Sequence, residues 1–137
     1  AACRRTTTAE QWGDSMRKIE EAMVRAIKAR SSWAQANTQV VVSDGDDHKK
    51  IRVYLHDNLI CDLHVYELWF LVRFDHCGWM TNTTKSRLNA IAHHLGFGSI
   101  RQIDGEWYWQ GDKSRPFDHR QDWMRVVEAQ LPEEVAA

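Results

Sequence analysis

The apolar positions of this chain first follow a helical spacing and then a strand spacing. From Ala9 to Ser31, apolar residues recur every three or four positions with charged residues between them, which predicts a long amphipathic helix. Thr8 is the expected N-cap of this helix, and Ser31-Ser32 is its expected end. Seven Lys and Arg against four Asp and Glu give residues 1–35 a local charge of +3, a bias typical of a solvated helix face.

The middle of the chain shows the two-residue alternation of β-strands. Strands are expected at residues 39–43, 51–55, 59–65 and 68–74. The charged residues 44–50 form an exposed turn after the first strand, and Asp57-Asn58 is the tight connection of a hairpin between the second and the third. The fourth strand is apolar at both odd and even positions, so we expect it to be central in the sheet and covered on both faces.

Another helix and a second hairpin are expected after these strands. The helix begins near Thr83 and ends at Gly96, which is a natural C-cap. Asp104-Gly105 then predicts a hairpin between strands at 99–103 and 106–110. The sequence shows no linker and no internal repeat between these elements.

The order of the elements predicts one α+β domain that spans residues 1–137. Its parts are an N-terminal helical segment at 1–35, a sheet with the middle helix at 39–110, and a C-terminal helix at 117–131 that Asp118 caps. The sheet is expected to be antiparallel, with about five strands. The N-terminal amphipathic helix, the middle helix and the C-terminal helix are expected to pack against it.

Composition narrows the class of protein. The net charge of -1 excludes a uniformly basic nucleic-acid binder and leaves only a local basic patch. Three widely spaced cysteines are not a disulfide framework, so we expect a reducing compartment, and no apolar run is long enough to cross a bilayer. We therefore expect a cytoplasmic protein without membrane contact. Seven tryptophans in 137 residues are the clearest compositional excess. Some of these rings must fill the core, but tryptophan is also enriched in recognition surfaces, so the excess favours an interaction role.

Polar residues are densest between Cys77 and Asn89, where a strand pattern ends and a helix begins. Hydroxyls and cations at a helix N-terminus can hold a phosphate, because the free backbone N–H groups and the helix dipole favour negative charge there. The candidate phosphate-binding residues are Thr81, Thr83, Thr84, Lys85, Arg87 and Asn89. The aromatic strand of the second hairpin supplies candidates for base stacking or partner contact: Trp107, Tyr108 and Trp109.

The same helix start also has a purely structural interpretation. In it, Thr81 or Thr83 caps the helix, Arg87 pairs with a carboxylate, and Asn89 forms hydrogen bonds with the second hairpin. Both interpretations stay open at the level of the sequence.

The sequence supports metal binding and catalysis less well than it supports phosphate binding or partner contact. Cys61, His64, His76 and Cys77 are residue types that bind zinc, but their spacing along strands directs neighbouring side chains to opposite faces. We therefore predict no metal site and no cofactor. The histidines and aspartates of the chain form no recognisable pair of nucleophile and base, so we predict that the protein is not an enzyme.

Three stretches of the chain resemble small proteins of tailed bacteriophages, a type without an assigned activity. That type has a hairpin with a short polar turn, a Gly-Trp-x-Thr-x-Thr-Thr-[Lys/Arg]-x-Arg-Leu-Asn helix start and a Gln-x-x-Gly-x-Trp-Tyr strand. The matching residues are 55–58, 78–89 and 102–108. The chain departs at His56-Asp57-Asn58, where the similar proteins usually have glycine in the turn. The resemblance implies a phage or prophage origin and a compact fold, and it implies no catalytic residues.

The sequence thus predicts a non-catalytic accessory binding protein of phage type, located in the host cytoplasm. The first expectation is contact with nucleic-acid phosphate through the Thr-rich helix start. The alternative is a protein–protein interaction module, either a host-protein inhibitor or a virion component, that uses a Trp-rich surface. A second copy of the chain is a further candidate partner. Trp33, Trp79 and Trp109 stand next to turns or element ends, where a ring is harder to bury.

Overall fold

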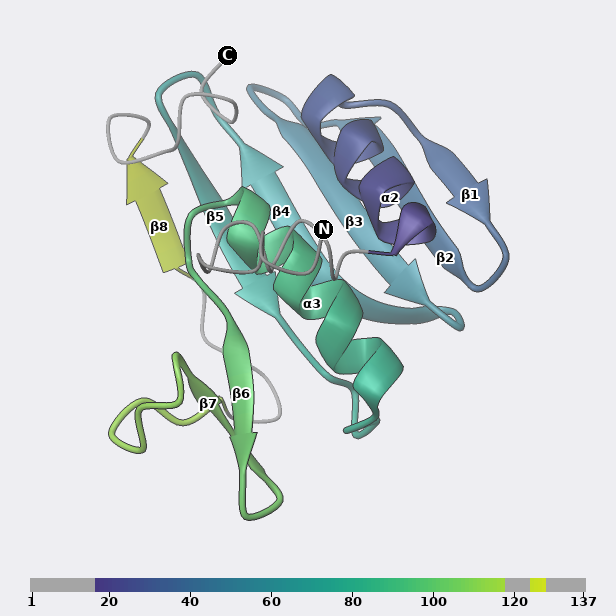
Figure 1. The fold of residues 1–137 in the computed structure, drawn as a ribbon. Helices are drawn as coiled ribbons and strands as arrows, with labels where there is room; N and C mark the ends of the chain where they lie inside the picture. The colour runs from purple at the N-terminus through teal and green to yellow at the C-terminus, as the bar shows by residue number, and fades with distance from the viewer. Residues whose placement is uncertain (1–16, 118–123, 128–137) are drawn as a thin grey trace, which may run out of the picture.

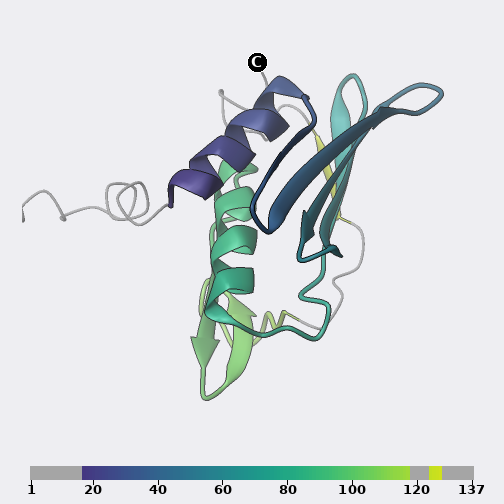
Figure 2. The ribbon, with the colours of Figure 1, turned by 90° about the vertical axis from the view of Figure 1, so that its right-hand side faces the viewer.

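The computed structural model describes residues 17–117 and 124–127, which form two layers (Figure 1). One layer is a six-stranded antiparallel sheet in the order β1-β2-β3-β4-β5-β8. The other holds two helices, both on the same face of this sheet (Figure 2). The helices are α2 (Lys18–Ala29) and α3 (Asn82–His94). The strands are β1 (Trp33–Gln35), β2 (Thr38–Asp44), β3 (Lys49–Leu55), β4 (Asn58–Val65), β5 (Trp69–Phe74), β6 (Ile100–Ile103), β7 (Glu106–Trp109) and β8 (Met124–Val127).

The core lies between the sheet and the helices. Alternate residues of β3 and β5 are buried on this face, as the two-residue period of a strand requires. The helices contribute Met23 and Ile27 from α2 and Leu88 and Ile91 from α3. Each fully buried side chain of this kind contributes about 1.5–3 kcal/mol of hydrophobic free energy. The α+β class and the antiparallel sheet are therefore confirmed.

The two faces of strand β5 differ in burial. Phe70, Val72 and Phe74 are buried, whereas Trp69 and Leu71 are half-buried on the face away from the helices. Full burial on both faces, which the apolar pattern predicted, is therefore not confirmed within the described residues.

The expected C-terminal helix over 117–131 is not confirmed, because Met124–Val127 forms β8 within that range. Strand β8 pairs antiparallel with β5, and Val126 lies opposite Phe70. Consecutive valines favour a strand, and an unpaired edge of β5 would expose a row of backbone hydrogen-bonding groups. The expected cap Asp118 and the rest of the range lie outside the described residues, apart from Phe117.

Element boundaries differ from the expectation in three places. Helix α2 begins at Lys18, and the expected start at Ala9 with its cap Thr8 lies outside the described residues. Strand β1 was not expected, since three residues are too few for a periodic signal. The hairpin turn is His56-Asp57, one residue earlier than expected, with positive φ angles of 50° and 66°. Two left-handed residues in a two-residue turn favour glycine, which explains why the similar proteins have glycine there.

Candidate functional site

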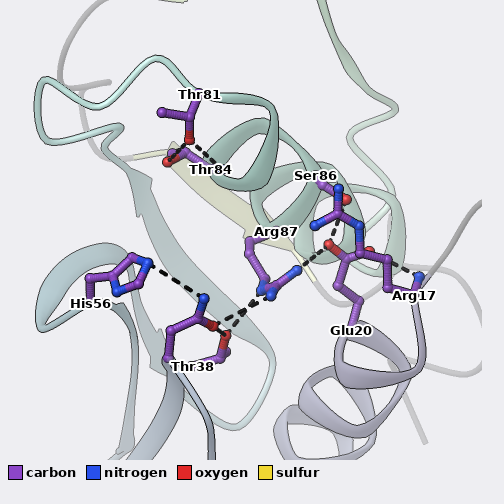
Figure 3. Close-up of polar contacts among 9 residues, drawn as sticks. Arg17, Glu20, Thr38, His56, Thr81, Thr84, Ser86 and Arg87 are labelled. Atoms are coloured by element: carbon purple, nitrogen blue, oxygen red, sulfur yellow. Dashed lines mark hydrogen bonds and ion pairs between the residues drawn. The ribbon is translucent and has the colours of Figure 1, made fainter.

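The first turn of α3 is closed by its own threonines. Thr81 is the N-cap, and its Oγ1 accepts a hydrogen bond from the backbone N–H of Thr84 at 3.1 Å. The hydroxyls of Thr81 and Thr84 also lie 3.0 Å apart (Figure 3). An N-cap of this kind stabilises a helix by about 0.5–2 kcal/mol. Two of the predicted phosphate-binding residues thus have a structural task as well.

Arg87 is buried in an ion pair between the two helices. Its Nη1 donates to Glu20 Oε2 at 2.6 Å, and its Nε donates to Thr38 Oγ1 at 3.0 Å (Figure 3). The same Glu20 oxygen accepts from Ser86 Oγ at 2.5 Å, while Oε1 accepts from the Arg17 N–H at 3.1 Å. Arg87 and Glu20 are only 3% and 1% exposed. The guanidinium of Arg87 therefore neutralises a carboxylate of its own chain and does not reach the surface.

Asn89 connects α3 to the second hairpin. Its Nδ2 donates to the Ile100 carbonyl oxygen at 3.1 Å, and its Oδ1 accepts from the Ile100 N–H at 2.6 Å. Lys85 is the one predicted cation of the group at the surface, and its Nζ donates to Gln102 Oε1 at 3.2 Å. The contacts of Arg87 and Asn89 match the structural interpretation of the helix start.

We predict that Asn89→Ala lowers the free energy of unfolding by about 1–3 kcal/mol, because both backbone groups of Ile100 lose their partner. Urea denaturation followed by circular dichroism measures the change. The matched control is Asn82→Ala, an exposed asparagine in the first turn of the same helix, for which we expect about 0.5 kcal/mol or less. Equal effects of the two substitutions would contradict the proposed task of Asn89.

The aromatic residues predicted for base stacking are mostly core residues. Trp107 and Trp109 are 1% and 5% exposed, and Trp109 packs edge-on against Phe74 with ring centroids 5.7 Å apart. Tyr108 is half-buried. A base therefore has no access to either buried indole in this conformation.

A pocket opens where the amino end of α3 meets the β3–β4 turn. Its volume is about 500 Å³, and carbon atoms form most of its wall. The lining residues are Leu55, His56, Asn58, Ile60, His76, Trp79, Thr81, Thr83 and Thr84. Leu55, Ile60 and His76 are buried and form the deep part, whereas Trp79 and Thr81 are exposed at the rim. The volume lies within the usual range of ligand pockets, about 300–1,000 Å³.

The segment before α3 holds Trp79 in an exposed position. Asp75 Oδ1 accepts from the Cys77 N–H at 2.7 Å, and the Gly78 N–H donates to His76 Nδ1 at 3.0 Å. The Trp79 N–H then donates to the His76 carbonyl oxygen at 2.8 Å. These local bonds hold the backbone of the turn at Trp79, whose indole is 59% exposed.

The pocket unites residues from three separate parts of the sequence. Of the predicted site residues, only Thr81, Thr83 and Thr84 line it, and Lys85, Arg87 and Asn89 do not. The sequence did not indicate that His56 and His76 belong to this pocket, because it associated His56 with the hairpin turn and His76 with a possible zinc site. Trp79 had a signal, since it follows Gly78 directly and stands next to a helix start.

The cysteines and histidines do not form a metal centre in the part of the chain that the structure describes. No group of three or more His, Cys, Asp and Glu side chains in residues 17–117 and 124–127 is placed to hold a metal ion. Cys61 is in the core, and burial raises the pKa of its thiol far above the usual range. His64 lies three residues further on, among the polar side chains of the sheet face away from the helices. Cys61 would have to be a thiolate to bind a metal, and its buried position disfavours that form.

A second polar cluster surrounds His64 on the sheet face away from the helices. Its Nε2 lies 3.2 Å from Asp62 Oδ1, and its Nδ1 lies 3.1 Å from His48 Nε2. Burial lowers the pKa of His64 below its usual value, and Asp62 only partly opposes this, while His48, Lys50 and Arg52 lower it further. In the hydrogen bond between the two imidazoles, one ring nitrogen donates and the other accepts. This bond would be lost if both rings were protonated.

We predict that stability falls as the pH drops below about 6.5 because of His64. Its folded-state pKa lies below that of the unfolded chain, so the unfolded chain binds the additional proton more readily. Urea midpoints at neutral pH and at mildly acidic pH measure the effect. His64→Gln should lose less stability on acidification than the wild type. An equal loss in both proteins would contradict the role of this ring.

The comparisons with known proteins place the chain in a phage family. The family model described as Kyanoviridae Gp96 protein matches residues 16–126, which is most of the 137 residues. The chain therefore belongs to the Kyanoviridae Gp96 protein family, and the phage origin implied by the resemblance is confirmed. The searches of curated proteins and of solved structures found no match. Among the residues that the structure describes, neither helix has the length and apolar composition of a membrane span.

Proposed function

From its membership of this phage family and the geometry of its pocket, we propose that the protein is a non-catalytic accessory protein that binds another protein. The pocket at the amino end of α3 accepts apolar side chains from a segment of that partner. The observation that carries the proposal is the exposed indole of Trp79 at the rim of a mainly carbon-lined pocket. Exposed tryptophans next to a desolvated pocket are typical centres of binding energy in protein interfaces.

Charge favours a protein ligand over a phosphate at this pocket. Arg87, which the sequence suggested as a phosphate ligand, is occupied by Glu20. Lys85 is not a lining residue and contacts Gln102 instead. A phosphate in the pocket would therefore depend on threonine hydroxyls, helix N–H groups and the imidazoles of His56 and His76, without a Lys or Arg side chain in the lining. Nucleic-acid binding gains most of its affinity from such cations.

Exposed apolar residues next to the pocket extend the proposed contact. Met80 lies between the lining residues Trp79 and Thr81 in the sequence and is 42% exposed. Aromatic residues and methionine are enriched in protein interfaces. The turn at residues 75–79 is already ordered by its own hydrogen bonds, which reduces the entropy lost on binding.

Affinity capture from a lysate of phage-infected host cells tests the proposal. The bait proteins are the wild type and Thr83→Trp, which fills the pocket, and the control is Leu68→Ala. Leu68 is 61% exposed and follows β4, whereas the pocket lies at the beginning of that strand. We expect one protein to be captured by the wild type and by Leu68→Ala, to be lost with Thr83→Trp, and to rebind in purified form. Nuclease treatment should not change the result.

Nucleic-acid phosphate at the start of α3 is the second candidate. Its support is that Thr81, Thr83 and Thr84 all line the pocket at the amino end of the helix. It predicts mobility shifts with DNA or RNA at low salt that weaken in Lys85→Ala. Capture that disappears after nuclease treatment, together with such shifts, would favour this candidate and contradict the protein ligand.

A further inference from the structure

The side of helix α2 that faces away from the sheet is mainly basic. Met23 and Ile27 are buried in the core, and the opposite side of the helix is exposed (Figure 2). The exposed cations of the helix and its N-cap are Arg17, Lys18, Arg25 and Lys28. Lys18, Arg25 and Lys28 follow each other at steps of seven and three residues, and such steps keep side chains on one side of a helix.

The cations of this exposed side exceed its acids. Glu21 is the one exposed acid of α2, so four positive charges and one negative charge leave +3, on a chain whose formal charge is -1. The other acid of the helix, Glu20, is buried and is neutralised by Arg87. The exposed side of α2 is therefore the local basic patch that the net charge of the whole chain left possible.

Arg30 is left out of this count because it has acidic neighbours. It follows the helix and lines a surface pocket of about 400 Å³ together with Lys49 and three acids. The acids are Asp44, Asp47 and Glu67. The basic side of α2 therefore ends at Lys28.

The four cations of α2 make no ion pair within residues 17–117 and 124–127. Cations elsewhere have partners in their own chain. Lys49 Nζ lies 2.7 Å from Asp44 Oδ1, and Lys85 Nζ donates to Gln102 Oε1. Glu21 makes no ion pair either, although helical spacing places it near Lys18 and Arg25. The positive charge of α2 is therefore available to an external anion.

We propose that the exposed side of α2 binds the phosphates of a nucleic-acid duplex. A rise of about 1.5 Å per residue spreads the four cations over about 16 Å of a rigid helix, along which a duplex offers one charge about every 1.7 Å. The helix contains no aromatic residue, so it offers no ring on which the bases of a single strand could stack. A duplex has the denser phosphates and is the better ligand. Contact with phosphates alone does not read the base sequence.

Fluorescence anisotropy with a short labelled DNA duplex of mixed sequence tests this proposal at low salt. Four cations on duplex phosphates predict a slope of about -3.6 in log affinity against log salt concentration. Arg25→Gln combined with Lys28→Gln should weaken binding at least about tenfold and reduce the slope to about -1.8. Glu21→Gln should strengthen binding about threefold, because it removes the one acid that repels phosphates on this side.

The matched control removes the same charge from the other end of the molecule. Lys113 and Arg115 are exposed in the segment that follows β7 (Figure 1), so Lys113→Gln combined with Arg115→Gln should leave the affinity within about twofold. Trp79→Ala and Lys85→Ala should also leave it unchanged, which separates this proposal from both candidate ligands of the pocket at α3. Thermal melts establish that each variant is folded.

Several outcomes would overturn the proposal. They are undetectable binding, an equal loss in the control at positions 113 and 115, no gain from Glu21→Gln, and tighter binding of a single strand than of the duplex. Polyglutamate that competes as well as the duplex at the same concentration of charge would also overturn it, because the basic side of α2 would then fit an acidic protein.

Discussion

Arg87→Ala is expected to lower the free energy of unfolding by about 3–5 kcal/mol, more than any other single substitution proposed for this protein. The guanidinium of Arg87 is the charged partner of Glu20, which is 1% exposed. Without it, the carboxylate would remain buried with only the Ser86 hydroxyl and the Arg17 N–H as donors. Chemical denaturation of the purified protein, followed by tryptophan fluorescence, measures the loss.

Two controls separate the ion pair from a general effect on α3. Lys85→Ala removes a cation from the same helix at the surface, and we expect a change of about 0.5 kcal/mol or less. Replacing both partners, in Glu20→Met with Arg87→Met, should recover a large part of the loss, because no unpaired charge is then buried. If Arg87→Ala costs less than about 1 kcal/mol, the guanidinium is not needed for the fold, and a role in ligand binding regains support.

Trp79→Ala is expected to weaken binding of the captured protein partner by at least about 2 kcal/mol, or about 30-fold in Kd. The indole is exposed at the rim of the pocket and contributes little to the core, so the free energy of unfolding should change by about 0.5 kcal/mol or less. Calorimetric titration with the purified partner and chemical denaturation measure the two quantities. Trp79→Ala should therefore raise the Kd of the partner without lowering the free energy of unfolding.

The matched control for Trp79→Ala is Leu68→Ala, another exposed apolar residue at the far end of β4. It should leave the Kd unchanged. A loss of affinity in Leu68→Ala equal to that in Trp79→Ala would point to a nonspecific apolar contact rather than to the pocket.

Local patterns were sufficient to predict most of the elements. The middle helix and the second hairpin are observed as Asn82–His94 and Ile100–Trp109, because helical spacing, a threonine cap and Asp104-Gly105 act within a few residues. Strand β8 could not be predicted in the same way. Its valines have a spacing that also suits a helix, and the unpaired edge of β5 that accepts it is formed by residues more than 50 positions earlier.

The site was less predictable because its contacts join distant parts of the chain. The sequence allowed Arg87 to pair with a carboxylate, but Glu20, 67 residues away, could not be identified as the partner. The pocket likewise requires the β3–β4 turn with His56 to meet the amino end of α3. Trp79 and the threonines at positions 81, 83 and 84 had a local signal, since they stand between a glycine turn and a helix start.

Photo-crosslinking in phage-infected cells tests most directly the claim that the pocket at the amino end of α3 is a protein-binding site. A benzophenone side chain replaces Met80, an exposed residue between the lining residues Trp79 and Thr81, and in a second protein it replaces Leu68. We predict a discrete adduct with one protein from position 80 that is absent from position 68 and is lost when Thr83→Trp fills the pocket. No adduct from position 80, or the same adducts from both positions, would contradict it.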